Sequence, residues 1–297
     1  KEKLKKHPLP AVCGIAHTRW ATHGEPSETN AHPHRQGHVT LVHNGIIENY
    51  HELSEELYQK GYRFYSQTDT EIACTCIDAA YRQMKDPLRA LQVAQRQLKG
   101  SYAFAVLFDD HPDVIYAMRC GSPLIAAASE DASFVASDIP ALLAYTRSYL
   151  VLDEKDIAVL HGNSIALFDA EGKKKKVCMQ QTSLDLHSIQ KEGYAHFMLK
   201  EIHEEAHAVE TTLHSFEKEG VQSKDGRPFA LKDYRAVSIV ACGSAYHAGM
   251  IAKELIESEA RVPVQLEVAS EFRYRNPLLP EKTLVILISQ SGETADT

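Results

Sequence analysis

The segment from residue 17 to residue 34 gathers side chains that suit binding of a small polar ligand. Arg19 offers a planar guanidinium fork that matches the geometry of a carboxylate. Thr22, His23 and His32 can fix further polar atoms of the same ligand. Trp20, the single tryptophan of the chain, lies in the same stretch. These residue types predict a site for a small molecule that carries a carboxylate.

Two further segments add complementary chemistry. The apolar run at 39–43 ends at Asn44-Gly45, a dipeptide that predicts a turn. An asparagine amide beside a backbone N–H is also the usual donor pair of an oxyanion hole. Asp69 is expected at the start of a helix, where its carboxylate can bind an ammonium group. Together these groups describe a site for an amino acid with a side-chain amide. The residues leave a plainer alternative open, in which Arg19 and Asp69 pair with each other and the histidines are structural.

A second group of polar residues follows two expected strands near the end of the sequence. Ser289, Gln290, Ser291 and Thr294 come after an apolar run, and Ser244 comes after another. Phosphate binds in parallel sheets at the carboxyl edge of the strands, against the N-terminus of a helix. The segment therefore predicts a phosphate cradle, although an ordinary serine–glycine loop would read the same.

A third pattern has the residue types of a zinc peptidase. His203 and His207 stand four residues apart on an expected helix with glutamates between them, which has the form HExxH. The sequence offers no third ligand at a fixed spacing, so a polar helix face is the preferred interpretation. We expect no metal at this position.

The elements that must position these residues fall into two groups. Before residue 185, helices cluster and many short strands follow, which is typical of a layered α+β domain. After a long helix at 194–218, strands and helices alternate, which predicts a parallel, doubly wound sheet. The expected strands are 12–17, 39–43, 102–108, 114–118, 124–128, 134–136, 150–152, 157–160, 164–168, 236–241, 262–268 and 283–288, and the other helices are 48–60, a helix capped by Asp69 or Thr70, 87–98 and 246–259.

Composition excludes several classes of protein. The 297 residues suit about two domains, and the formal net charge of −8 argues against a nucleic-acid partner. No apolar run approaches the roughly 20 residues that cross a bilayer, so we expect no membrane partner. Six scattered cysteines suit reduced thiols and a cytoplasmic location. The lysine run at 173–176 predicts a solvated hairpin tip or sheet edge.

The motifs themselves carry a family resemblance over nearly the whole chain. TRWATHGEP, NAHPH, HNGIIENY and TDTE, in this order and spacing, resemble the class II glutamine amidotransferase domain of the glucosamine-6-phosphate synthase family. RCGSPL, ASDIPALL, ACGSAYHAG and ISQSGETADT resemble the linker and the first sugar-isomerase (SIS) domain of the same family, the isomerising glutamine–fructose-6-phosphate aminotransferases. Amidophosphoribosyltransferases and asparagine synthetases share the first domain type but do not continue into SQSGET.

The resemblance implies a fold, a reaction and partners. It implies an N-terminal nucleophile hydrolase-type layered α+β domain at 1–185, a linker at 186–193 and an α/β SIS domain at 194–297. The implied reaction converts L-glutamine and fructose 6-phosphate to L-glutamate and glucosamine 6-phosphate, the first step of amino-sugar synthesis. No cofactor is implied, and we expect a homodimer of the full-length protein.

The resemblance also assigns roles to residues. It makes Asn44 and Gly45 the oxyanion hole of the catalytic site and Trp20 the gate of an ammonia channel. The implied glutamine-binding residues are Arg19, Thr22, His23, His32 and Asp69, and the implied sugar-phosphate-binding residues are Ser244, Ser289, Gln290, Ser291 and Thr294. Ala245 departs from the family pattern because it lacks a hydroxyl.

The family nucleophile is an N-terminal cysteine whose own α-amine acts as the base. This sequence opens on Lys1, and Cys13 lies inside the chain without a free amine. We therefore expect a fragment that lacks the nucleophile and both domain ends, and that is inactive alone. The alternative is a non-catalytic, sugar-phosphate-binding regulatory module.

Overall fold

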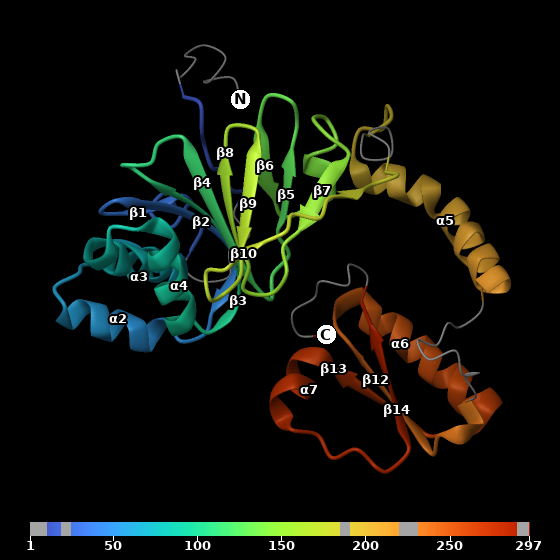
Figure 1. Cartoon of the computed structure of the whole chain (residues 1–297). Helices are drawn as coiled ribbons and strands as arrows, with labels where there is room; N and C mark the ends of the chain where they lie inside the picture. The colour runs from blue at the N-terminus through green and yellow to red at the C-terminus, as the bar shows by residue number, and fades with distance from the viewer. Residues whose placement is uncertain (1–10, 19–24, 185–190, 220–230, 290–296) are drawn as a thin grey trace. The chain divides into compact units, whose positions relative to one another are not determined.

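The computed structural model describes residues 11–18, 25–184, 191–219, 231–289 and 297 (Figure 1). Contacts divide the chain into two compact units, residues 1–189 and 190–297, and each is described here by itself. The division between residues 189 and 190 lies in the segment predicted as a linker, 186–193. The exact domain bounds stay a prediction. Among the described residues, no helix is long and apolar enough to cross a membrane.

Unit 1 is built on two antiparallel sheets. The larger sheet has the order β1-β2-β3-β4-β8-β9-β10 and the smaller one the order β11-β7-β5-β6. Strand pairing is antiparallel throughout both sheets. The strands are β1 (His34–Gln36), β2 (Val39–Ile47), β3 (Gly100–Phe108), β4 (Val114–Cys120), β5 (Ile125–Ala128), β6 (Ser133–Ala136), β7 (Ser148–Val151), β8 (Ile157–His161), β9 (Ser164–Phe168), β10 (Lys174–Lys175) and β11 (Gln180–Gln181).

Three helices cover one face of the larger sheet (Figure 1). They are α2 (Tyr50–Gln59), α3 (Asp69–Met84) and α4 (Pro87–Gln97). The sequence predicts all three, and each packs buried apolar side chains against the sheet, among them Leu53, Ile77 and Leu91. The N-cap of α3, however, is Thr68, whose hydroxyl accepts the backbone N–H of Glu71. The expected caps Asp69 and Thr70 are wrong because Thr68 is the residue with extended backbone angles, and those two residues already belong to the helix.

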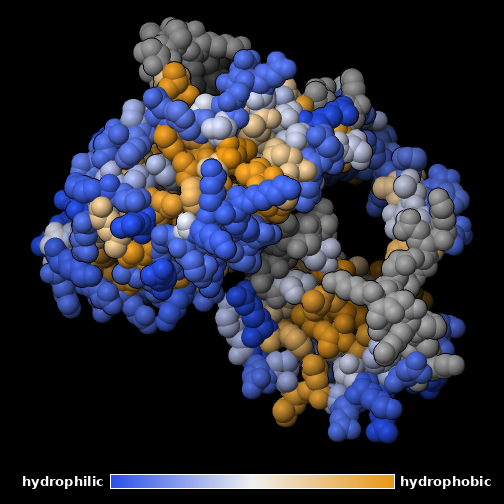
Figure 2. All heavy atoms as spheres, viewed as in Figure 1, coloured by the Kyte–Doolittle hydropathy of each residue, from blue (hydrophilic) through white to orange (hydrophobic). Residues whose placement is uncertain are grey.

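Two apolar cores separate the layers of unit 1. One lies between the helices and the larger sheet, and includes Phe104 and Leu91. The other lies between the two sheets and includes Ala103 and Leu150. Neighbours on β3 fall in different cores because successive side chains of a strand point to opposite faces. In the space-filling view, hydrophilic residues cover most of the visible outside of this unit around a smaller apolar area (Figure 2).

Two predictions near the start of the chain are wrong. Residues 11–18 contain no strand, because no described strand pairs with the expected strand at 12–17. Asn44 and Gly45 are not a turn either: β2 continues through them to Ile47, with Asn44 opposite Ala103 and Gly45 opposite Tyr102. Pairing with β3 extends the strand, and Gly45 accommodates a φ of +131° there.

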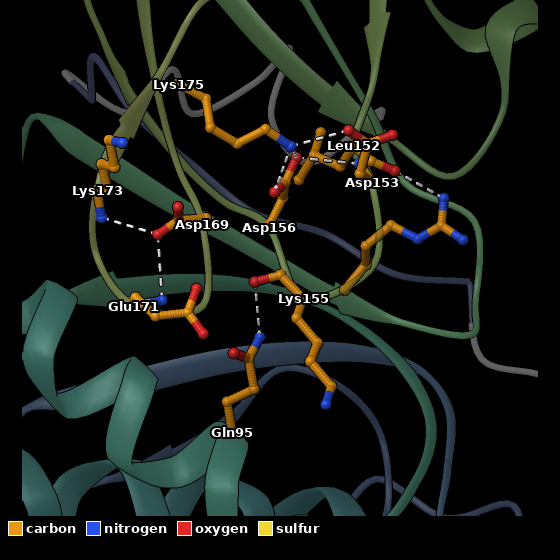
Figure 3. A network of polar contacts seen from close by, with 10 residues as sticks. Gln95, Leu152, Asp153, Lys155, Asp156, Asp169, Glu171, Lys173 and Lys175 are labelled. Atoms are coloured by element: carbon orange, nitrogen blue, oxygen red, sulfur yellow. Dashed lines mark hydrogen bonds and ion pairs between the residues drawn. The ribbon is translucent and has the colours of Figure 1, made fainter.

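The lysine run lies at a sheet edge, as the sequence predicts. Lys174 and Lys175 form β10, which pairs with β9 at the end of the larger sheet. Figure 3 shows the Lys175 ammonium turned toward Asp153 and Asp156. Its Nζ lies 2.8 Å from Asp153 and 2.8 Å from Asp156, whose side chain is only 2% exposed. The ion pairs fasten β10 to the loop before β8, so the run is not a uniform basic patch.

Unit 2 contains the predicted parallel sheet. Its order is β13-β12-β14, and β12 pairs in parallel with both neighbours. Gly249 lets α6 approach this sheet, since an added Cβ would lie 2.8 Å from the side chain of Leu266. The elements are α5 (Phe197–Glu219), β12 (Ala236–Ala241), α6 (Gly243–Leu255), a π-helical turn (Ile256–Ala260), β13 (Val264–Val268), α7 (Ala269–Arg275) and β14 (Thr283–Ile288).

Candidate functional site

A cavity of about 590 Å³ in unit 1 brings together predicted site residues from three segments. Its wall includes His32, Asn44, Gly45 and Asp69. Apolar side chains from both sheets close other parts of the wall, among them Ala103 of β3, Val135 of β6 and Leu124 just before β5. Polar groups on an apolar background are typical of a small-molecule site. Arg19, Trp20, Thr22 and His23 lie outside the described residues.

Asp69 reaches the cavity from the first turn of α3. Its carboxylate is almost fully buried, and Oδ2 accepts the backbone N–H of Ile47 at 2.8 Å. The first turn of a helix favours a negative charge because unpaired N–H groups point outward there. A carboxylate has about four acceptor positions, and the backbone N–H of Ile47 uses one of those on Asp69.

A network of hydrogen bonds holds the loop that leads into Asp69. The carboxylate of Glu71, which is fully buried, accepts the backbone N–H groups of Tyr65 at 2.9 Å and of Ser66 at 2.7 Å. It also accepts the Ser66 hydroxyl at 2.7 Å. Thr68 Oγ1 in turn lies 3.0 Å from Nε2 of His34 on β1. The loop is therefore tied to β1 on one side and to α3 on the other.

Asn44 and Gly45 line the cavity near the end of β2. Asn44 is exposed, and its side-chain amide makes no hydrogen bond with any other described residue. The preceding residue, His43, is buried, because alternate side chains of β2 face opposite sides of the sheet. An added Cβ on Gly45 would lie 2.0 Å from the Ser101 carbonyl oxygen, so this position requires glycine. A free amide at a fixed place on a strand suits stabilisation of a developing oxyanion.

Sequence reasoning missed several residues of the cavity. Thr70 and His43 line it and are hydrogen-bonded to each other at 3.0 Å. Ser137, just after β6, also lines it. His17 contributes its ring, which lies 4.4 Å from the His32 ring, and burial lowers the pKa of His17. Thr70 could have been predicted as a cavity residue because it directly follows Asp69 in the sequence Thr68-Asp69-Thr70. No neighbouring motif in the sequence predicts that Ser137 lines the cavity.

Cys13 does not have the surroundings of a nucleophile. Burial raises the pKa of its thiol, whereas an activated cysteine needs a lowered one. It is not among the described residues that line the cavity.

In unit 2, Ser244 and Ser289, two of the predicted phosphate-binding residues, follow neighbouring strands at the same edge of the sheet. Ala241 at the end of β12 is opposite Ile288 at the end of β14, and the strands are parallel. Ser289 therefore emerges beside the segment Cys242 to Ser244 that begins α6. Gly243 has a φ of +58° at this strand-to-helix junction. Gln290, Ser291 and Thr294 lie outside the described residues.

The histidines of the HExxH pattern are not gathered around a metal position in the described part of the chain. His203 stacks on the ring of Tyr194 at 5.3 Å. Among the described residues, the group with three possible ligands is His38, Asp109 and Asp110, on the surface of unit 1. There, Asp109 already accepts from His38 at 2.8 Å and pairs with Arg35 at 3.6 Å.

Comparison with known proteins agrees with this architecture. The chain matches a glutamine amidotransferase domain at residues 17–144 and a SIS domain at residues 230–297. It is 44% identical, over its whole length, to the glutamine–fructose-6-phosphate aminotransferase (isomerising) of Caldanaerobacter subterraneus. With the enzyme of the same name from Aquifex aeolicus it shares 47% identity over 97% of its length.

The matched part of each relative is limited. The chain covers 50% of the Caldanaerobacter protein and 48% of the Aquifex protein, so it spans about half the length of the curated relatives it matches. Among solved structures, the C-terminal domain of glucosamine-fructose-6-phosphate aminotransferase from Francisella tularensis aligns with 36% of this chain and 30% of its own, with 46% identity and a TM-score of 0.33. The sequence is thus similar to about half the length of the isomerising glutamine–fructose-6-phosphate aminotransferases, with a match to a glutamine amidotransferase domain followed by a match to a SIS domain.

Proposed function

We propose that unit 1 binds L-glutamine and that the chain serves the synthesis of glucosamine 6-phosphate. In this reaction L-glutamine is hydrolysed to L-glutamate, and the released ammonia aminates fructose 6-phosphate, which is isomerised to glucosamine 6-phosphate. The observation that carries the proposal is that Asp69 and Asn44 line the same cavity, which is of small-molecule size. The names of the matching relatives supply the reaction.

The cavity suggests how glutamine would be held. The carboxylate of Asp69 accepts N–H groups of the substrate ammonium, and His32 bonds a further polar atom. The Asn44 amide and the Gly45 backbone N–H donate to the amide oxygen as it gains negative charge. For the remaining contacts we propose Arg19 at the substrate carboxylate, Thr22 and His23 at its other polar atoms, and Trp20 at the path of ammonia.

We propose the carboxyl edge of β12 and β14 as the place where the phosphate of fructose 6-phosphate binds. Two features support this: Ser289 and Ser244 follow neighbouring parallel strands, and α6 begins at the same edge. Backbone N–H groups at a helix start favour a phosphate dianion. Gln290, Ser291 and Thr294 complete the proposed cradle. We further propose that the whole protein acts as a homodimer in the cytoplasm.

Binding of L-glutamine, measured by calorimetry, tests the assignment without requiring turnover. Asp69→Asn keeps an oxygen for the N–H of Ile47 but removes the charge that meets the ammonium, so we expect affinity to fall at least about tenfold. Asp131→Asn removes an exposed carboxylate elsewhere in unit 1 and is the matched control. Equal affinity of Asp69→Asn and the unaltered protein would remove Asp69 from the site. Ser291→Ala, titrated with fructose 6-phosphate, tests the cradle in the same way.

A further inference from the structure

The hydroxyl of Thr70 lies between two imidazoles at the wall of the cavity. Its Oγ1 is 3.2 Å from Nε2 of His32 and 3.0 Å from Nδ1 of His43. Thr70 is 2% exposed and His43 is 3% exposed, so solvent does not compete strongly for these contacts. The three residues come from different segments, since His32 precedes β1, His43 is in β2 and Thr70 is in α3.

The direction of each hydrogen bond follows from the donors that are fixed. The backbone N–H of His43 points at Nδ1 of His32, at 3.5 Å, so this nitrogen accepts and carries no proton. His32 is then neutral, and its single proton is on Nε2, which donates to Thr70. Because the Thr70 hydroxyl has one proton, it donates that proton to Nδ1 of His43. The three hydrogen bonds then run in one direction, from the His43 N–H to His32, from His32 to Thr70, and from Thr70 to the His43 ring.

This closed set of bonds connects both halves of the proposed glutamine site. Thr70 directly follows Asp69 on α3, and His43 directly precedes Asn44 on β2. Asp69 itself bonds Ile47 farther along β2, so two adjacent residues of α3 hold the strand on either side of Asn44 and Gly45. A displacement of Thr70 would move the carboxylate and the amide relative to each other.

We propose that Thr70 is a positioning residue of the glutamine site, whose hydroxyl holds His32 as the neutral Nε2–H tautomer and fixes His43 beside Asn44. The inference rests on the proposed function and adds to it a group that does not itself touch the substrate. Neighbouring rings limit the freedom of both imidazoles: His17 and His34 lie 4.4 Å and 5.4 Å from the His32 ring, and Phe104 lies 4.9 Å from the His43 ring.

The test combines nitrogen NMR of the histidine rings with binding of L-glutamine, both on the 297-residue chain. In the unaltered protein, two-bond proton–nitrogen spectra should show His32 and His43 each protonated on Nε2 and not on Nδ1. Thr70→Val removes the hydroxyl at nearly constant volume, and the tautomer signals of both rings should become mixed. Affinity for L-glutamine should fall at least about fivefold, because the hydrogen bonds that align the site are lost.

Two variants separate positioning from general destabilisation. Thr70→Ser restores the hydroxyl and should restore both the tautomers and the affinity. Thr75→Val makes the same change at another buried threonine of α3, whose hydroxyl donates to the Glu71 carbonyl at 2.7 Å and bonds no other residue that the structure describes. It should change neither readout.

The outcomes distinguish the two proposals. A His32 that is cationic or protonated on Nδ1 in the unaltered protein overturns the role of Thr70, even if Thr70→Val fails to fold. Unchanged tautomers and affinity in Thr70→Val overturn it as well. Failure of the unaltered protein to bind L-glutamine would instead overturn the proposed function.

Discussion

Oδ2 of Asp69 accepts the backbone N–H of Ile47 at 2.8 Å, which ties the first turn of α3 to β2. The bond joins residues 22 positions apart and reaches the last residue of β2, the strand that carries Asn44. Both groups are buried, since Asp69 is 3% exposed and Ile47 is 0% exposed. The carboxylate thus has a structural partner within the protein as well as a place on the wall of the cavity.

Gly45→Ala should destabilise the protein strongly, because the new Cβ would meet the Ser101 carbonyl oxygen at 2.0 Å and the backbone φ is +131°. Gly61→Ala is the matched control: its φ is also positive, at +93°, but no atom lies within 4 Å of the added Cβ. The control should show only backbone strain, about 1–2 kcal/mol. We expect Gly45→Ala to cost at least about 2 kcal/mol more in urea unfolding. Equal losses would mean that β2 and β3 separate easily at this point.

Glu71→Gln should reduce the free energy of unfolding by roughly 1.5–3 kcal/mol. In the unaltered protein the Glu71 carboxylate accepts the backbone N–H groups of Tyr65 and Ser66 and the Ser66 hydroxyl. The substitution places an N–H₂ group, itself a donor, against some of these donors. Chemical denaturation measures the loss, and Glu55→Gln, an exposed position on α2, serves as the control. If both variants unfold at the same denaturant concentration, the buried carboxylate does not hold the loop before Asp69.

Lys175→Met should destabilise unit 1, whereas Lys174→Met should not. Lys175 pairs with Asp153 and with the buried Asp156, and these carboxylates raise its pKa (Figure 3). Loss of the ammonium leaves Asp156 without its counter-ion, so we expect a cost of about 1–3 kcal/mol. Lys174 is exposed on the same short strand and should change stability by less than about 0.5 kcal/mol.

A double-mutant cycle of Lys175→Met with Asp156→Asn measures the pair directly. The two effects should be less than additive because each substitution removes the same contact. Additive effects would show that Lys175 acts through something other than Asp156.

His17 should make unit 1 less stable as the pH falls. Burial lowers the pKa of His17 in the folded protein below its value in the unfolded chain, which is about 6.5. Around and below that pH the unfolded state binds more protons than the folded state, so the free energy of unfolding decreases as the pH falls. The contribution of neutral His17 to stability is complete once the pH rises above about 6.5. His17→Gln should flatten this slope between about pH 7 and pH 5. Thermal unfolding at several pH values measures it.

His161→Gln replaces an exposed imidazole on β8 and controls for the substitution itself. An unchanged pH slope in His17→Gln would mean that protonation of other groups accounts for the loss of stability.

The sequence by itself determined much of the element order. Apolar periodicity predicted the three helices of unit 1, most of its strands and the parallel sheet of unit 2, because burial imposes periods of 3.6 and 2 on the chain. Motif spacing also singled out His32, Asn44 and Asp69, which line one cavity. The roles of these residues in binding and catalysis stay predictions.

Only the tertiary structure decided how those residues are held. The dipeptide Asn44-Gly45 reads locally as a turn, yet pairing with β3 keeps it within a strand. Ile47, which bonds Asp69, and His43, which bonds Thr70, lie on β2 more than twenty residues away, and Ser137 lines the cavity just after β6. A local pattern records the backbone preference and the buried face of each segment, whereas hydrogen bonds between distant segments exist only once the layers have packed. The geometry of the site therefore follows from the packing of α3 against β2.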